Sequence, residues 1–224
     1  MNNSLLLYKK KILDIITAAL RLENLSTIKG VTEKILNKEN QNVTHQEKMI
    51  INNTKEAYKT LEDLLDLPID LHLICHYHKI LGTNLIRTNG KLRTFPVSVS
   101  GTSYIPEMPV DYIVKEKINE IIGKNELPYN IIKLMIYLMR AQIFEDCNKR
   151  TAVVIANHLL IKNDIGILLL PEDVEEMRKF KDKLMVFYET ENYDETINFI
   201  LENYIISSKD QTTDDTSSFN NLKF

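Results

Sequence analysis

The sequence predicts an all-α protein, and three features of the chain support that prediction. Apolar residues recur at helical spacing over most of the 224 residues, and only six glycines and six prolines interrupt them. Two almost wholly apolar segments, residues 131–139 and 152–161, are typical of helices buried on nearly all sides. One stretch, Pro96 to Tyr104, alternates with the period of two that indicates strands and turns at Gly101. We therefore expect a helical bundle with one short β-hairpin.

Composition limits the class of protein. Apolar residues make up 44% and charged residues 26%, which is the profile of a globular domain, and the length suits one core. The net charge of −3 and the lack of a basic block argue against nucleic acid as a partner. We find no signal peptide and no apolar run that could span a bilayer, so we expect a cytoplasmic protein with no membrane contact.

Two helices are expected early in the chain, before a short third one. Residues 4–23 have an amphipathic pattern with lysines opposite the apolar side, and residues 46–65 resume the helical period after a polar stretch. After Pro68, residues 71–81 form the third helix. Its His72 and His76 are four positions apart and could in principle share a metal, but no glutamate follows in the zinc-protease pattern, so we interpret them as packed or surface residues.

Further helices are expected after the predicted hairpin. Residues 110–122, 172–189 and 194–206 each place apolar side chains on one face. Residues 207–224 are polar and poor in aliphatic side chains, which is typical of a disordered tail.

The polar turn between the two apolar segments is the candidate functional site. Two acids, an amide and two bases lie between core helices in Phe144-Glu145-Asp146-Cys147-Asn148-Lys149-Arg150-Thr151. Asp146 or Cys147 would precede the second helix, so backbone N–H groups up to Arg150 would point out of its N-terminus. With Lys149 and Arg150 these groups suit phosphate, and Asp146 suits a divalent cation bridging to it. A solvated connection with ordinary capping residues is the alternative.

These residues resemble the motif of the Fic/Doc family. That motif reads His, any residue, Phe, any residue, Asp or Glu, Gly or Ala, Asn, Gly or Lys, Arg. Four positions match it, and a fifth matches its Doc-like branch: Phe144, Asp146, Asn148, Arg150 and Lys149. The resemblance implies a Fic-type helical bundle over residues 25–206, after an N-terminal helical extension over residues 1–24.

Three positions depart from the family's pattern. Gln142 replaces the histidine, as in a subgroup of related sequences, and Val153 stands where many Fic enzymes have a second arginine. Cys147 replaces a small residue. A thiol at a helix N-terminus beside two cations could be redox-sensitive, although a small side chain tolerated next to phosphate is the favoured interpretation.

The resemblance also implies a set of ligands and roles. ATP would lie over the turn, Asp146 would hold Mg²⁺, and Gln142 and Arg150 would occupy the catalytic positions. The nucleotide would be contacted by Cys147, Asn148, Lys149, Arg150 and Thr151. The predicted hairpin resembles the family's flap, which aligns the backbone of a target protein by strand addition through Val97, Ser98, Val99, Ser100, Gly101 and Thr102. An ordinary surface hairpin is the alternative.

The implied reaction is transfer of AMP from ATP to a hydroxyl of a target protein. A carboxamide cannot accept a proton, so Gln142 cannot act as a general base, a loss that costs about 10²–10⁴-fold in rate. It could still orient the hydroxyl. Lys149 leaves open a Doc-like kinase that transfers the γ-phosphate, and Gln142 with Val153 leaves open a non-catalytic nucleotide-binding module. Whether the chain is an enzyme stays undecided at this point.

In many Fic proteins a glutamate at the end of an N-terminal helix pairs with the motif arginine and blocks productive ATP binding. Setting Ile28-Lys29-Gly30 over the family's Ile-Glu-Gly puts Lys29 at the place of that glutamate. A lysine would repel Arg150, so this alignment predicts that the clamp is absent. A helix end capped by Gly30 is the alternative, and a separate inhibitory partner protein stays open.

Overall fold

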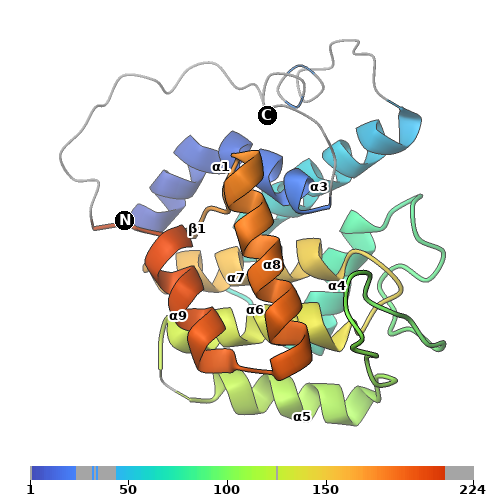
Figure 1. The fold of residues 1–224 in the computed structure, drawn as a ribbon. Coiled ribbons are helices and arrows are strands. Elements are labelled where there is room, and N and C mark those ends of the chain that lie inside the picture. The colour runs from blue at the N-terminus through green and yellow to red at the C-terminus, as the bar shows by residue number, and fades with distance from the viewer. Residues whose placement is uncertain (1, 24–31, 33, 35–43, 125, 210–224) are drawn as a thin grey trace.

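The structure is a computed structural model, and it describes residues 2–23, 32, 34, 44–124 and 126–209. Helices make up most of the described chain, as the sequence predicts, and the fold class is confirmed (Figure 1). In chain order the elements are α1 (Asn3–Leu22), α3 (His45–Asp63), α4 (Leu71–Leu81), α5 (Asp111–Ile122), α6 (Tyr129–Ala141), α7 (Asn148–Lys162), β1 (Gly166–Leu168), α8 (Val174–Thr190), α9 (Tyr193–Tyr204) and β2 (Ile205–Ser207).

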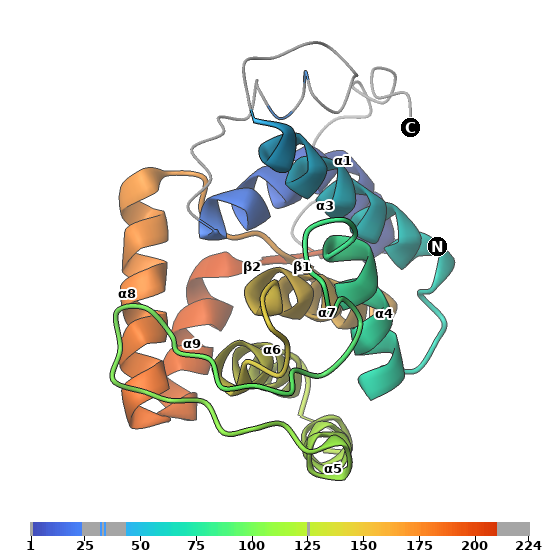
Figure 2. The ribbon, with the colours of Figure 1, turned by 90° about the vertical axis from the view of Figure 1, so that its right-hand side faces the viewer.

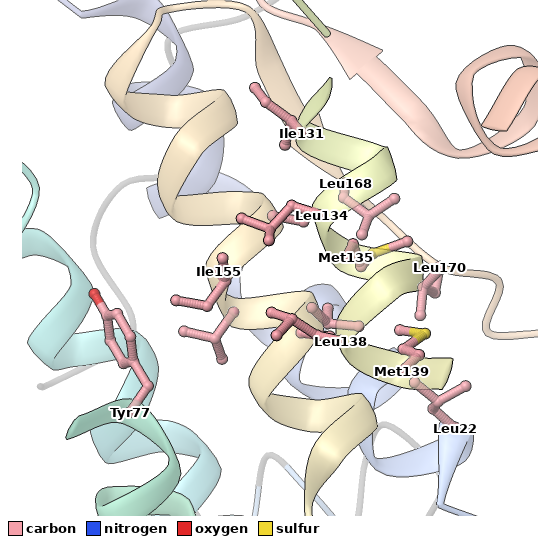
Figure 3. Packing of buried hydrophobic residues seen from close by; sticks show 14 of the residues in the cluster. Leu22, Tyr77, Ile131, Leu134, Met135, Leu138, Met139, Ile155, Leu168 and Leu170 are labelled. Carbon is pink, nitrogen blue, oxygen red and sulfur yellow. The ribbon is translucent and has the colours of Figure 1, made fainter. Parts of the chain in front are cut away.

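Helices α6 and α7 form the centre of the bundle. Figure 2 shows them end-on, with α1 and α3 on one side of the pair and α5 on the other. Helix α7 packs against α1, α3, α4 and α6, and this explains why almost every residue along it is buried. In Figure 3, Leu134 and Leu138 of α6 lie beside Ile155 of α7. Burying such a side chain contributes about 1.5–3 kcal/mol, so the packing fixes the turn that joins the two helices.

Helix α1 belongs to the same core as the central pair. It packs against α7 and β1, and Tyr8, Ile15 and Leu22 are buried in one cluster with the residues of α6 and α7. The last turn of α1 therefore lies close to the start of α7. The division of the chain at residue 24 stays a prediction.

The predicted β-hairpin is wrong in its secondary structure. Between Pro96 and Tyr104 the chain is extended on either side of a turn at Gly101, whose φ is +85°, and no strand forms there. A strand needs a partner strand, and none among the described residues pairs with this segment; instead Arg93 binds the carbonyls of Phe95 and Pro106 on either side of it, and Glu189 binds Ser103 near its tip. The assignment of this loop as a flap stays a prediction.

The sheet of the described chain lies elsewhere. Strands β1 and β2 pair antiparallel, with Gly166 opposite Ser207 and Leu168 opposite Ile205. The last helix accordingly ends at Tyr204, earlier than its apolar pattern predicts, and β2 extends into the segment that the sequence assigns to the tail. Residues 210–224 lie outside the described chain. None of the described helices combines the length and the apolar composition needed to cross a membrane.

Candidate functional site

The turn of residues 142–147 is closed by the side chain of Asn148. Its Oδ1 accepts the N–H of Phe144 at 3.0 Å, and its Nδ2 donates to the carbonyl of Phe144 and to Oε1 of Gln142, both at 3.0 Å. Gln142 and Cys147 bound the turn in the left-handed region, with φ of 45° and 60°. Such backbone is costly for residues other than glycine and persists only where its surroundings impose it. Asn148 therefore sets the shape of the turn.

His78 of α4 holds the turn from its other side. Its ring stacks on Phe144 with centroids 3.8 Å apart, and its Nδ1 accepts the N–H of Gly90 at 2.8 Å. Because Nδ1 accepts, Nε2 carries the proton and donates to the carbonyl of Asp146 at 3.0 Å. Burial lowers the pKa of His78 to about 4, so the ring is neutral at pH 7. No periodicity or motif in the local sequence predicts this contact.

A metal site made of protein groups alone is not present in the part of the chain that the structure describes. No group of three or more His, Cys, Asp or Glu side chains is placed to hold an ion there, and His72 and His76 are exposed. Asp146 is exposed too, with its Oδ1 accepting the N–H of Cys147 at 2.6 Å. One such carboxylate fits Mg²⁺, which is commonly bound by one or two protein carboxylates together with substrate phosphates and water.

The N-terminus of α7 is open for an anion. The first N–H groups of a helix have no acceptor within it, and Cys147 supplies no side-chain cap. Arg150 lies in this first turn and is only 4% exposed, yet its Nε and Nη1 lack a hydrogen-bond partner among the described residues. By contrast, five other helices carry a side-chain cap, from Asn2, Thr44, Asp70, Asp173 and Asn192.

A carboxylate from the end of α1 faces this anion site. Oε2 of Glu23 lies 3.4 Å from Nζ of Lys149, and Oε1 lies 3.8 Å from Nε of Arg150. Glu23 thus makes a contact with Arg150 of the kind that the alignment assigned to position 29. Lys29 lies outside the described residues, so the predicted absence of a clamp at that position stays a prediction. At 3.8 Å the pair with Arg150 is electrostatic and leaves its hydrogen bonds unmade.

Three further side chains of residues 145–151 are buried or half-buried. Cys147 is 1% exposed, and burial raises the pKa of its thiol to about 12, so it is protonated at neutral pH and the redox-sensitive interpretation fails. Thr151 is equally buried, and its Oγ1 has no hydrogen-bond partner among the described residues. Glu145 is half-buried and accepts a hydrogen bond from Oγ1 of Thr88 at 2.6 Å.

The flap runs from the turn across to α8 (Figure 2). Its tip is held by Glu189, which accepts bonds from the N–H of Ser103 at 2.5 Å and from its Oγ at 2.8 Å. The six residues predicted to meet a target lie before this anchor, and each is exposed or half-buried: Val97, Ser98, Val99, Ser100, Gly101 and Thr102. These residues thus form an accessible loop that turns at Ser100 and Gly101 beside α8.

Known proteins resemble this arrangement. Residues 68–160 match the Fic/DOC family, and this range includes the turn, His78 and the flap. No curated protein matches the sequence. A Fic-domain signalling protein from Bacteroides thetaiotaomicron superposes with a TM-score of 0.73 at 13% identity, covering 89% of this chain and 84% of that one.

Two further solved structures have the same fold. Fic-1 from C. elegans gives a TM-score of 0.68 at 16% identity over 89% of this chain, and a Fic family protein from Desulfovibrio desulfuricans gives 0.70 at 15% over 85%. The chain covers 65% of the length of the first of these solved chains and 61% of the second. The described chain therefore has the fold of Fic proteins, and its residues 68–160 match the Fic/DOC family.

Proposed function

We propose that the turn between α6 and α7 binds ATP through its phosphates and that the chain transfers AMP to a hydroxyl of a target protein. The observation that carries this proposal is Arg150, a buried cation with Nε and Nη1 unbonded in the described structure, at the open N-terminus of α7. Leaving buried donors unsatisfied costs about 1–3 kcal/mol each, which an arriving phosphate would recover. The helix dipole favours the same charge.

Several groups of the turn and of the first turn of α7 would bind the nucleotide together. Lys149 and Arg150 neutralise the phosphates, and the N–H groups of the first turn of α7 hold their oxygens. Asn148 contributes through the shape of the turn, because its amide is already bonded inside it. Asp146 is the residue that would hold Mg²⁺. When bound, that ion supplies charge neutralisation at the phosphates.

Gln142 orients the target hydroxyl in this proposal and does not take its proton. Its Oε1 accepts a bond from Asn148, and its Nε2 donates to the carbonyl of Met139 at 2.6 Å, so the amide is fixed in place. A carbonyl oxygen has two acceptor positions, and the second can receive the hydroxyl. Catalysis then rests on positioning and charge neutralisation. Without a base, the reaction is about 10²–10⁴-fold slower than it would be with a histidine at this position.

The flap supplies the docking surface for the target. Strand addition along the accessible backbone of Val97 to Thr102 would dock a target segment on this loop, because such recognition uses exposed backbone N–H and C=O groups. Glu23 restrains the site until nucleotide displaces it from Lys149 and Arg150. We place this restraint within the chain, and an inhibitory partner protein is not needed to explain it.

Two alternatives have an observation in their favour. Lys149, a second cation beside Arg150, suits a Doc-like kinase that moves the γ-phosphate. The amide of Gln142, bonded within the turn on both sides, suits a nucleotide-binding module without turnover.

One experiment separates the three functions. Purified protein with Mg²⁺ receives ATP labelled at the α- or the γ-phosphate, and label is followed on the protein and on a lysate. We expect transfer from α-labelled ATP that is lost in Arg150→Ala. Transfer from γ-labelled ATP alone would establish the kinase, and transfer only in Gln142→His would establish the binding module. No label in any variant would refute the catalytic proposal.

A further inference from the structure

Arg93 lies immediately before the flap and is the largest fully buried side chain of the described residues, at 1% exposure. It is bonded to the end of α6 twice. Its backbone N–H donates to the carbonyl of Ile143 at 3.0 Å, and its side-chain Nε donates to the carbonyl of Gln142 at 2.7 Å. Arg93 is thus attached to the first two residues of the turn.

The far end of the guanidinium reaches both ends of the flap. Nη1 donates to the carbonyl of Phe95, where the flap leaves the core, at 2.9 Å. Nη2 donates to the carbonyls of Pro106 and Glu107, where the flap returns, at 3.2 Å and 2.5 Å. One planar group therefore joins three backbone segments: the start of the turn, the entry of the flap and its exit.

The chemistry of these contacts points to positioning. Every hydrogen-bond acceptor that Arg93 has in the described structure is a backbone carbonyl, apart from the thioether of Met108 at 3.0 Å. A buried cation without a carboxylate partner is a costly way to fill a core, which an apolar side chain would fill better. A guanidinium, however, presents five N–H groups in one fixed plane, and this geometry can hold several carbonyls in register at once. A lysine has one ammonium and cannot reach all three segments.

We propose that Arg93 is a positioning residue that fixes the flap, residues 95–108, against the turn that begins at Gln142. Without it the flap would separate from the turn, while Lys149 and Arg150 would keep their places at the start of α7. The predicted loss of function rests on the proposed transfer of a phosphoryl-containing group to a target held by the flap. The structural part of the proposal, fixation of the flap, does not.

The test compares Arg93→Lys and Arg93→Met with Arg87→Lys, an exposed arginine six positions upstream. Hydrogen–deuterium exchange is measured on peptides covering the flap, α6 and α7, and ATP affinity is measured by calorimetry. We expect exchange in residues 95–108 to rise about tenfold or more in both Arg93 variants, with α6 and α7 still protected. We also expect ATP affinity to stay within about threefold and label transfer to fall about tenfold or more. Arg87→Lys should match the wild type.

Two results would overturn the proposal. Unchanged flap exchange in both Arg93 variants would show that other contacts fix the flap. Equal loss of protection in the flap, α6 and α7 would show that Arg93 stabilises the whole core. If the wild type binds no ATP, the proposed function fails, and the exchange data alone still decide the role of Arg93.

Discussion

Neutralising Glu23 should strengthen nucleotide binding, because its carboxylate lies where the proposed phosphate would lie. The carboxylate oxygens are 3.4 Å from Nζ of Lys149 and 3.8 Å from Nε of Arg150. At an effective dielectric constant of about 20, each contact represents roughly 4–5 kcal/mol of gross attraction. Desolvation of the charges cancels most of this, and partly buried pairs of this kind leave a net of about 1–2 kcal/mol.

A ligand that must displace Glu23 loses that net energy. Since about 1.4 kcal/mol corresponds to a factor of ten, we expect Glu23→Gln to bind ATP roughly 5–30-fold more tightly in the presence of Mg²⁺. The assay is calorimetric titration of the wild type and the variant at low ionic strength, where the screening of the pair is least. Glu62→Gln is the matched control, because Glu62 pairs with Lys9 at 2.8 Å on another part of the surface.

A second variant tests whether the gain in ATP affinity comes from the contact between Glu23 and Arg150. In an Arg150→Ala background, Glu23→Gln should gain less affinity, because one of the two cations that the carboxylate contacts is gone while Lys149 remains. Equal affinity of Glu23→Gln and the wild type would refute the reasoning. A gain of the same size with and without Arg150 would place the effect outside this contact.

Three further predictions follow from the same geometry. Arg150→Ala should weaken ATP binding by about tenfold or more, because it removes a charged hydrogen-bond donor worth roughly 1.5–3 kcal/mol, as calorimetry can check; an unchanged affinity would contradict the site. Gln142→His should raise the rate of label transfer by about 10²–10⁴-fold if a base is what the turn lacks; an equal rate would contradict that role. The pKa of His78 and that of His158 are both lowered to about 4 by burial, so the unfolded chain binds more protons and stability should fall as pH drops from about 6.5 towards 4. Urea unfolding of His78→Gln should show a slope reduced by up to about 1.4 kcal/mol per pH unit, and an unchanged slope would exclude His78 as a source.

The sequence predicted the central pair of helices and the turn between them because those features are local. The apolar runs on either side predict two buried helices, and the polar residues between them predict a start near Cys147, which is the residue directly before α7. The predicted strand was wrong because strand formation depends on a partner that can lie far away in the sequence. The period-two pattern around Val99 is real, but a strand needs a partner, and here Arg93 and Glu189 take the backbone groups.

Contacts between residues that are distant in the sequence were the second feature of the site that sequence patterns did not predict. Glu23 and Arg150 are far apart in the chain, and nothing in the local pattern at the end of α1 shows that they meet. Similarly, the stacking of His78 on Phe144 depends on how α4 packs against α7, which no periodicity reveals. An alignment by motif alone put Lys29 at the position of the family's glutamate and did not point to Glu23, which the fold brings to Lys149 and Arg150.

Two carboxylates outside residues 68–160 touch the two parts that the proposed reaction must use. Glu23 faces Lys149 and Arg150 at the anion site, and Glu189 binds Ser103 at the tip of the flap. The matched region thus holds the groups that we propose for nucleotide binding and for target docking, and each of the two flanking helices, α1 and α8, contacts one of them. Helices α1 and α8 also contact each other, and Nζ of Lys181 donates to the carbonyl of Arg21 at 2.8 Å. Displacement of Glu23 by nucleotide would therefore change the contacts of α8, the helix that anchors the flap. Binding of nucleotide and presentation of the target would then be linked through α8, and the exchange rate of the flap with and without ATP measures that link directly.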